Sequence, residues 1–461
     1  MIQQEPICAL ATATGVGALG VIRVSGTGTF EIVNRLFRGK NLTQVESHTV
    51  HLGTIREGAT IIDEVLVSVF KSPKSFTKED TVEISCHGSD YIIRQILKLL
   101  VKNGARLARP GEFTQRAFLN GQFDLVQAEA VADLIAADSA ASHRTALNQL
   151  RGGFSKKLSA LREELIHFAS LVELELDFGE EDVEFADRDD LRKFIQSLQS
   201  TITPLIDSFD FGNALKEGVP VAIIGAPNVG KSTLLNALLN EEKAIVTAIA
   251  GTTRDVIEDI LYIDGIKFRI IDTAGIRDTD DIVESMGIER SKRAMNQADI
   301  VLLLFDGEET YAEVENLVQG LEEEKKVLWV KNKADLTSPN PLLSGEGFNP
   351  PSPVRRGAGD EVAISAKTGA GIEELKKTLA AMVVTAKTSD DTVVTNMRHY
   401  EHLLKTQEAL TDALNGLDMG ITGDFLAQDI RLALHHLGEI TGQIVNDDLL
   451  ANIFSKFCIG K

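Results

Sequence analysis

The first 118 residues combine short β-rich runs with one amphipathic stretch. The clearest runs are GVIRV (20–24), EVLVSVF (64–70) and TVEIS (81–85). The segment YIIRQILKLLVKNG (91–104) has apolar residues at helical spacing and ends at a glycine. Strands and helices in alternation predict a compact α/β or α+β domain over 1–118.

From residue 119 the apolar positions follow a helical period. One helix face is marked at three- and four-residue steps by Leu158, Leu161, Leu165, Phe168 and Val172. A second helical pattern begins near residue 390 and carries Leu403, Leu404, Leu410, Leu414 and Leu417, followed by FLAQDIRLALHHLGEI at 425–440. Both blocks predict packed helices.

Between the helical blocks, residues 217–385 have the pattern of a mononucleotide-binding α/β domain. Domain termini often lie close together, so we predict that this segment is inserted into one helical domain built from 119–216 and 386–461. The expected fold class is multi-domain, with α+β, discontinuous all-α and inserted α/β parts. The stretch 337–360 is rich in Pro, Gly and Ser and predicts a surface loop.

Charge and cysteine content narrow the class of protein. A net charge of −21 favours solubility and argues against tight non-specific binding to nucleic acid or anionic membrane, so any RNA must meet local basic patches. Cys8, Cys86 and Cys458 give neither a disulfide framework nor zinc-ligand spacing. Neither a signal peptide nor a membrane span of roughly 18 apolar residues is indicated. We expect a cytoplasmic protein without a membrane partner.

The strongest chemical signal is GAPNVGKST at 225–233, which follows the apolar run VPVAII and precedes LLNALL. It fits G-x-x-x-x-G-K-[ST] in the strand–loop–helix context of a phosphate-binding loop. Loop amides and the helix N-terminus would hold phosphates, Lys231 would reach the β and γ oxygens, and Ser232 would ligate magnesium.

Two switch-type motifs follow in the order expected of a guanine-nucleotide switch protein. GTTRD (251–255) offers Thr253 to magnesium and the γ-phosphate, and DTAG (272–275) offers Asp272 and the Gly275 amide.

Two more motifs concern the base. NKAD (332–335) follows an apolar run, and the Asp335 carboxylate can accept from N1 and N2 of guanine, which adenine cannot match. SAK (365–367) adds a backbone contact to the base edge. The motifs together predict GTP rather than ATP.

The residue that orients the attacking water is not evident from these motifs. Many switch GTPases carry Gln directly after DxxG, and this chain has Ile276 there. Arg254 and Arg277 are candidates for an arginine finger or ordinary loop residues. A monovalent cation beside the phosphates could supply the charge, with Asn228 as a neutral oxygen ligand. Alternatively, Asn228 is there because asparagine tolerates an unusual backbone angle in a tight turn.

The segments GAPNVGKST, AIAGTTRD, DTAGIRDTDDIVESMGIER and the C-terminal FCIGK resemble the MnmE/TrmE family of tRNA modification GTPases, and the likeness covers the whole chain. The resemblance implies a folate-binding and dimerisation domain at 1–118, the discontinuous helical domain, and a Ras-like G domain at 217–385. It also implies potassium-activated hydrolysis, with G domains pairing across the ion. The implied potassium ligands are Asn228, Thr247, and the carbonyls of Ile249 and Thr252.

The resemblance further assigns residues to catalysis and to folate. Glu284 in the second switch would orient water directly or through a second water, with Asn228 and Lys231 as the other catalytic residues. Folate, as 5-formyl- or methylene-tetrahydrofolate, would contact Arg23, Glu83, Gln122 and Lys461. Gln122 is uncharged, which argues against a charge-dependent role there. Cys458 lies either near the one-carbon chemistry or in helix packing.

The motifs and the resemblance together give the full set expected to contact GTP. It comprises Asn228, Val229, Gly230, Lys231, Ser232, Thr233, Thr247, Ala248, Ile249, Ala250, Gly251, Thr252, Thr253, Asp272, Thr273, Ala274, Gly275, Asn332, Lys333, Asp335, Ser365, Ala366 and Lys367. Magnesium would be held by Ser232 and Thr253.

The implied function is a GTP hydrolase that installs an aminomethyl or carboxymethylaminomethyl group on C5 of the wobble uridine of certain tRNAs. The implied partners are a second copy of the chain, tRNA, and a flavin-dependent protein of the MnmG/GidA family in a heterotetramer. Two alternatives stay open: a ribosome-assembly or RNA-chaperone GTPase, and a folate-binding scaffold whose GTPase is a regulatory clock.

Overall fold

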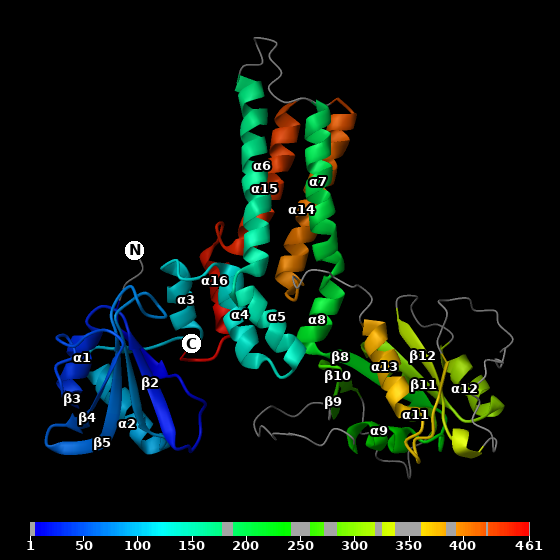
Figure 1. The fold of residues 1–461 in the computed structure, drawn as a ribbon, viewed down its shortest axis with the longest axis horizontal. Coiled ribbons are helices and arrows are strands. Elements are labelled where there is room, and N and C mark those ends of the chain that lie inside the picture. Colours follow the sequence, from blue (N-terminus) through cyan, green and yellow to red (C-terminus); the bar gives the residue numbers. More distant parts are fainter. Residues whose placement is uncertain are drawn as a thin grey trace. The chain divides into compact units, whose positions relative to one another are not determined.

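The computed structural model describes residues 5–177, 188–240, 259–271, 284–318, 325–336, 361–383, 393–420 and 423–460 (Figure 1). Two compact units make up the chain. Unit 1 comprises Met1–Ala136, Thr145–Pro204 and Arg398–Lys461, and unit 2 comprises Ala137–Arg144 and Leu205–Met397. Unit 1 therefore contains both the N-terminal sheet and most of the helical blocks.

The N-terminal part of unit 1 is built on one sheet with strand order β3-β4-β5-β6-β2-β1-β7. The pairs are antiparallel except β1 with β7. The strands are β1 (Ile7–Leu10), β2 (Leu19–Ser25), β3 (Phe37–Arg38), β4 (Thr49–Glu57), β5 (Thr60–Phe70), β6 (Thr81–His87) and β7 (Arg106–Leu107). The mixed strand and helix content predicted for this region is confirmed.

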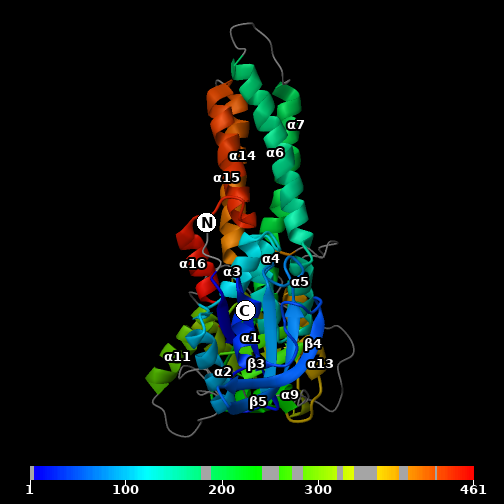
Figure 2. The ribbon, with the colours of Figure 1, turned by 90° about the vertical axis from the view of Figure 1, so that its left-hand side faces the viewer.

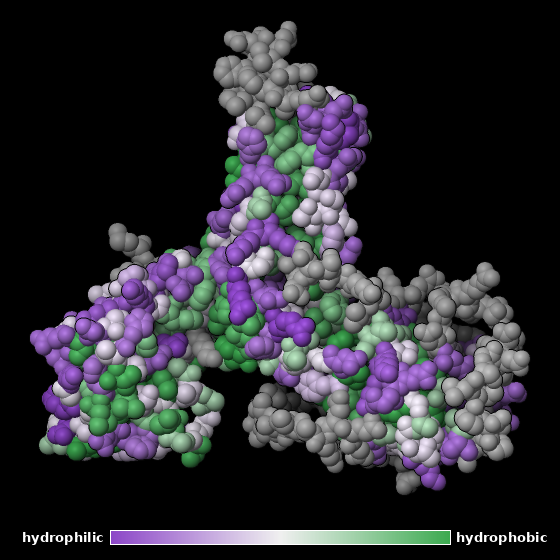
Figure 3. Space-filling view, in the orientation of Figure 1, coloured by the Kyte–Doolittle hydropathy of each residue, from purple (hydrophilic) through white to green (hydrophobic). Residues whose placement is uncertain are grey.

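Helices α1 (Thr29–Leu36) and α2 (Asp90–Lys102) pack together against this sheet. Alternate β5 residues Val65, Val67 and Val69 are buried with them in one core, as the two-residue period of a strand requires. On the opposite side of β4 and β5, Val50, Leu52 and Leu66 stay exposed, and apolar side chains gather over this sheet in Figure 3.

The helical part of unit 1 contains a bundle of long helices (Figures 1 and 2). The long helices are α6 (Gly153–Asp177), α7 (Arg188–Asp207), α14 (Met397–Asp418) and α15 (Gly423–Thr441). Shorter helices are α3 (Glu112–Leu119), α4 (Leu125–Ala136), α5 (Ala140–Leu150), whose first residues belong to unit 2, and α16 (Asp447–Ser455). Helix α6 packs along α15, and α7 is hydrogen-bonded to α14 through Gln199 and Thr411. Helices from the block before the P-loop segment and from the block after it therefore pack into the same bundle.

The predicted apolar face of α6 is confirmed, because its five marker residues from Leu158 to Val172 are all buried. In α14, Leu403, Leu410 and Leu417 are buried, whereas Leu404 is 40% exposed. The three buried leucines are seven residues apart and so lie on one side of α14, which is the side that faces the bundle.

Unit 2 has a sheet with strand order β13-β12-β11-β8-β10-β9. All neighbouring pairs are parallel except β10 with β9. Its strands are β8 (Val219–Gly225), β9 (Asp259–Ile263), β10 (Ile266–Ile270), β11 (Ile300–Phe305), β12 (Lys326–Lys331) and β13 (Glu361–Ala363). The chain changes direction along the sheet at β8, and crevices at such switch points are where α/β sheets bind ligands.

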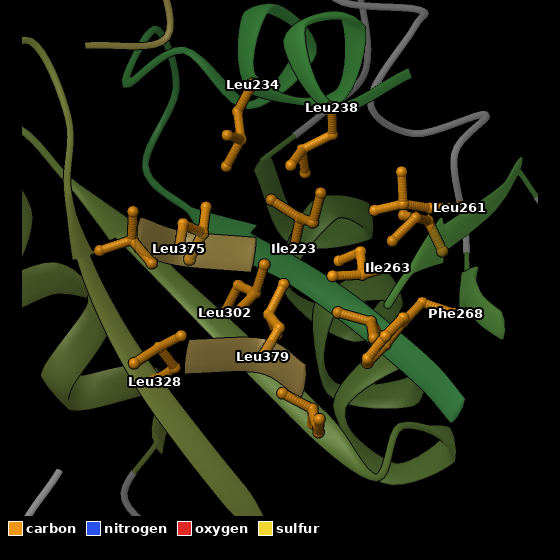
Figure 4. Packing of buried hydrophobic residues seen from close by; sticks show 14 of the residues in the cluster. Ile223, Leu234, Leu238, Leu261, Ile263, Phe268, Leu302, Leu328, Leu375 and Leu379 are labelled. Atoms are coloured by element: carbon orange, nitrogen blue, oxygen red, sulfur yellow. The ribbon is translucent and has the colours of Figure 1, made fainter. Parts of the chain in front are cut away.

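Helices cover both faces of this sheet, as a buried parallel sheet requires. They are α8 (Phe209–Glu217), α9 (Lys231–Asn240), α11 (Glu284–Gln297), α12 (Glu308–Val318), the 3-10 helix η2 (Ala334–Leu336) and α13 (Ile372–Val383). On one face, Leu234 and Leu238 of α9 and Leu375 and Leu379 of α13 pack onto strand residues such as Ile223 (Figure 4). On the other, Met295 and Val314 pack against a second apolar cluster.

Candidate functional site

The predicted phosphate-binding loop follows β8 and leads into α9, which begins at Lys231. The strand–loop–helix context expected from the sequence is therefore present. Gly225 is required at the end of β8, because a Cβ there would lie 2.6 Å from the Leu304 carbonyl oxygen.

The loop backbone has two residues in left-handed conformations. Asn228 has φ of 64° and Gly230 has φ of 99°. Asparagine tolerates this region better than most residues, so the structure shows the conformational role considered for Asn228. A Cβ on Gly230 would lie 2.4 Å from the Nδ2 atom of Asn332, which explains why only glycine fits there. Val229 between them is fully buried.

Lys231 folds back over the start of the loop. Its ammonium donates hydrogen bonds to the carbonyl oxygens of Gly225 at 2.8 Å and Ala226 at 2.9 Å. Burial lowers the pKa of Lys231 from its ordinary value. The ammonium is thus held at the loop. A bound phosphate would stabilise its positive charge and so compensate for the contact with water that burial removes.

Asn332 links the phosphate loop to the base-contacting loop. Its Nδ2 donates to the Val229 carbonyl at 2.7 Å, and its Oδ1 accepts from the Ala366 backbone amide at 3.0 Å. The side chain is 3% exposed. One buried amide therefore satisfies groups from two loops and fixes the distance between them.

Lys333 has φ of 58° and its ammonium pairs with the Asp306 carboxylate at 2.7 Å. Asp306 follows β11, and its pKa is lowered chiefly by the hydrogen bond from Lys333. Thr310 of α12 also donates to this carboxylate at 3.0 Å. Sequence analysis missed Asp306; a carboxylate directly after the apolar strand IVLLLF was the available signal.

The predicted base-recognition residues converge beside this pair. Asp335 lies exposed in η2, and the preceding Ala334 amide donates to the Ile364 carbonyl at 3.1 Å. Ser365 and Ala366 are buried, whereas Lys367 is exposed. The segments 332–335 and 365–367, distant in sequence, therefore lie side by side at the carboxyl ends of β12 and β13.

The remaining predicted GTP-site residues divide into two groups. Ser232 and Thr233 lie in the first turn of α9, and Glu284 is the first residue of α11. Outside the described residues lie Thr247, Ala248, Ile249, Ala250, Gly251, Thr252, Thr253, Asp272, Thr273, Ala274 and Gly275. The potassium and magnesium assignments that involve Thr247, Ile249, Thr252 and Thr253 therefore stay predictions.

In unit 1, the predicted folate residues Arg23 and Glu83 lie directly opposite each other on β2 and β6. Arg23 Nε donates to Glu83 Oε1 at 2.9 Å, and the two side chains are 17% and 27% exposed. The guanidinium carbon lies 5.3 Å from the centre of the Phe76 ring and 5.6 Å from that of Phe113. The pair thus forms a partly buried charged site lined by aromatic rings.

The C-terminal segment completes this site. Arg23 Nη1 donates to the Gly460 carbonyl at 3.5 Å, and the Gly111 amide donates to the Cys458 carbonyl at 3.4 Å. Gln122 follows α3 with an exposed side chain, and its hydrogen bonds among the described residues do not join it to Arg23 or Glu83. Lys461 lies outside the described residues.

The cysteines are separate from one another. Cys8 and Cys86 are buried and Cys458 is exposed, and all three are free thiols. Burial raises the pKa of Cys8 and of Cys86 to about 11, so both stay protonated at neutral pH. The thiol of Cys458 is exposed, which argues against a role for this residue in helix packing.

Family models match the chain over nearly its whole length. The model described as "MnmE helical domain" matches residues 125–458, and "GTP-binding protein TrmE N-terminus" matches 6–122. A tRNA modification GTPase MnmE from Cytophaga hutchinsonii is 56% identical over 99% of this chain and 98% of that protein. The chain belongs to the MnmE family of tRNA modification GTPases.

Other MnmE relatives are equally complete. Those from Flavobacterium johnsoniae and Bacteroides thetaiotaomicron are each 52% identical over 100% of both chains. Among solved structures, the FeoB G-domain from Methanococcus jannaschii is 27% identical, covers 36% of this chain and 97% of its own, and has a TM-score of 0.23. Like its MnmE relatives, the chain is a GTP-hydrolysing enzyme of tRNA modification.

The predicted fold class is confirmed, with a TrmE-type N-terminal domain, a helical domain, and a P-loop G domain inserted between the helical segments. Among the helices that the structure describes, we find none both long and apolar enough to cross a membrane.

Proposed function

We propose that this cytoplasmic MnmE chain hydrolyses GTP with potassium activation, and that its cycle drives modification of the wobble uridine with a flavin-dependent MnmG/GidA partner. Tetrahydrofolate, in a 5-formyl or methylene form, would supply the one-carbon unit for the aminomethyl or carboxymethylaminomethyl group. The division at 1–118, 119–216 with 386–461, and 217–385 assigns folate binding, relay of motion, and GTP hydrolysis to separate domains.

The observation that carries the proposal is the placement of Asn228. The buried Asn332 bridge holds the adjoining Val229 carbonyl, and the left-handed backbone holds Asn228 in the phosphate loop. Its neutral amide oxygen is a hard ligand suited to an alkali cation but too weak to bind one alone. Thr247 and the carbonyls of Ile249 and Thr252 would supply the other oxygens.

The loop residues have distinct roles in this proposal. Lys231 would stabilise charge on the β and γ oxygens, and Ser232 with Thr253 would hold magnesium, which would neutralise phosphate charge. Glu284, at the N-terminus of α11, would orient the attacking water as a hydrogen-bond acceptor. Potassium would supply the positive charge that an arginine finger supplies elsewhere.

The decisive experiment compares Asn228→Gly with Asn228→Ala. Glycine keeps the left-handed backbone and removes only the amide, whereas alanine strains the turn as well. We expect wild-type GTP hydrolysis to be at least about 100-fold faster in potassium than in sodium. Charge neutralisation by an arginine finger raises the rate of hydrolysis by ~10³–10⁵, so this expected ratio is a lower bound. In Asn228→Gly, the rates of hydrolysis in potassium and in sodium should be equal. GTP affinity should stay within about threefold of wild type, because the lost ligand acts in catalysis and not in GTP binding.

The opposite result has a clear meaning. If Asn228→Gly keeps the full potassium response and only Asn228→Ala is impaired, Asn228 acts through its backbone conformation alone. The ligand role would then be wrong, although the chain would still be a GTPase.

For folate, the Arg23 and Glu83 pair supports the assignment. The described contacts of Glu83 use Oε1, which leaves Oε2 to accept from the amino edge of a pterin. Arg23 would meet a carbonyl or carboxylate of the ligand. The contact of Arg23 with Gly460 supports including the C-terminal segment in the proposed folate site.

A further inference from the structure

Three potential metal ligands meet between α14 and α15 of unit 1, helices that Figure 2 shows side by side. His402 belongs to α14, and His436 and Glu439 belong to α15. One ligand atom from each lies within 4.8 Å of the other two. Across the part of the chain that the structure describes, no second group of this kind forms.

Two of the three distances match those of a coordination shell, and the ligand atoms of the two histidines lie within 4.8 Å of each other. His402 Nδ1 lies 3.3 Å and His436 Nδ1 lies 3.5 Å from Glu439 Oε2. A tetrahedral zinc ion with bonds of about 2.0–2.2 Å separates its ligand atoms by about 3.3–3.5 Å. One ion could therefore contact all three groups after only small side-chain movements.

The two imidazole nitrogens are buried polar atoms in need of a partner. Among the described residues, neither His402 Nδ1 nor His436 Nδ1 has a hydrogen-bond partner of acceptable geometry. Their side chains are only 13% and 14% exposed. Buried polar atoms of native proteins are nearly always satisfied, and a bound ion would satisfy both at once.

The surrounding charges permit a cation. Each imidazole binds a metal through the lone pair of a ring nitrogen, and the Glu439 carboxylate beside both rings supplies a negative charge. Lys405 opposes a cation through its charge. Arg398 does so less, because Glu129 pairs with it at 2.7 Å.

We propose that His402, His436 and Glu439 bind one divalent transition-metal ion of the zinc class, which joins α14 to α15, with water completing the coordination. Two imidazoles and one carboxylate suit zinc, cobalt or nickel. Magnesium and calcium prefer oxygen ligands and are disfavoured here. None of the three residues is assigned to GTP or to folate, so the proposal does not depend on either assignment.

The test uses cobalt as a visible probe with full-length, nucleotide-free protein treated with a chelator. A Cys458→Ser background removes the exposed thiol as a competing ligand. We expect one equivalent of Co²⁺ to bind, with visible absorption bands that excess Mg²⁺ does not remove and one equivalent of Zn²⁺ does. Zinc should also raise the thermal unfolding midpoint.

Three variants decide which residues bind. His436→Asn, His402→Asn and Glu439→Gln should each weaken Co²⁺ binding by at least about 100-fold, more than the loss of an outer-shell partner. His435 cannot serve as a control, because its Nε2 also lies 3.5 Å from Glu439 Oε2. His167→Asn is the control instead, because His167 is an exposed histidine on α6; this variant should bind cobalt as the parent does. Circular dichroism would establish that each variant is folded.

Two results would overturn the proposal. One is that the parent protein binds no cobalt at micromolar concentrations. The other is that folded His436→Asn and Glu439→Gln both keep the full absorption bands, which would place the bound metal elsewhere.

Discussion

At the residue scale, Asn332 has a role that its motif alone does not reveal. The sequence places it in the GTP-contacting set, but its two hydrogen-bond partners are 103 and 34 residues away in the chain. Such pairings depend on the order of the strands, which local patterns do not encode. The residue type was therefore predictable, whereas its function as a bridge between two loops was not.

Asp306 gives the first residue-scale prediction. Asp306→Asn removes the anchor of the Lys333 ammonium, a pair whose side chains are 23% and 37% exposed. Solvent screening keeps the expected loss small, about 1 kcal/mol, so guanine-nucleotide affinity should fall about fivefold. Fluorescent GDP titration measures this change.

The matched control for Asp306 is Glu309→Gln, a neighbouring exposed carboxylate on α12. It should leave nucleotide affinity unchanged. Equal affinities for both variants would show that Lys333 does not need Asp306 for its position.

Glu112, at the start of α3, gives a pH-dependent prediction. Burial alone would raise its pKa, but hydrogen bonds from Arg106 and the Arg109 amide, with the charges of Arg106 and Arg116, lower it to about 2. Because the folded pKa lies below the ordinary 4.5, the ionised carboxylate stabilises the fold above pH 4.5. That contribution is lost as the pH falls from about 4.5 towards 2.

Glu112→Gln should therefore lower the free energy of unfolding by about 3 kcal/mol at pH 7. The difference from wild type should shrink below pH 4.5, as urea denaturation at several pH values would show. Glu57→Gln, which alters an exposed pair with Lys102, should cost no more than about 1 kcal/mol. A difference for Glu112 that is constant from pH 7 to 3 would contradict the argument.

At the element scale, periodicity predicted the long elements well. The buried stripe of α6 and the buried β5 valines follow directly from apolar spacing. The two-residue strands β3 and β7 could not be predicted, because such short pieces form only where a neighbouring strand is already in place. Leu404 shows a further limit, since an apolar residue beside a buried one need not face the core.

The exposed face of β4 and β5 fits the homodimer that the family resemblance implies. Leu52 and Leu66 are cross-strand partners and are 65% and 47% exposed, and exposed apolar faces commonly mark interfaces. If this face forms the expected dimer, Leu52→Lys with Leu66→Lys should give a monomer, as light scattering would measure. Leu404→Lys, on the exposed side of α14, should leave the mass unchanged; a double variant that stays dimeric would place the interface elsewhere.

At the scale of the whole molecule, the inserted arrangement followed from the order of patterns in the sequence. The contact-defined units meet within α7, where Pro204 lies inside the helix. Proline removes one backbone hydrogen bond and favours a kink. The sequence showed this proline, but only the contacts show that one of the divisions between the units falls directly after it.

The proposed folate site joins distant parts of the chain, which makes it testable at this scale. Gly460 has φ of 96°, and a Cβ there would lie 2.0 Å from the Leu10 carbonyl oxygen. Gly460→Ala should displace the C-terminal segment from Arg23 and weaken 5-formyltetrahydrofolate binding about tenfold, the loss expected for one misplaced polar contact. Calorimetric titration of the full chain would measure it.

Ile459→Ala is the control, because that side chain is 61% exposed, and it should bind folate normally. Potassium-stimulated GTP hydrolysis should be unaffected in both variants. Unchanged folate affinity in Gly460→Ala would remove the C-terminal segment from the site.

The contact between Gly460 and Arg23 also bears on how the protein is made. A ribosome synthesises residues 457–460 after every other described part of the chain, so the nascent N-terminal sheet emerges with its charged site still open on one side. By then the P-loop unit has left the exit tunnel and can already fold. A chain that stops before Gly460 would therefore carry the phosphate-binding loop but lack the contact between Gly460 and Arg23.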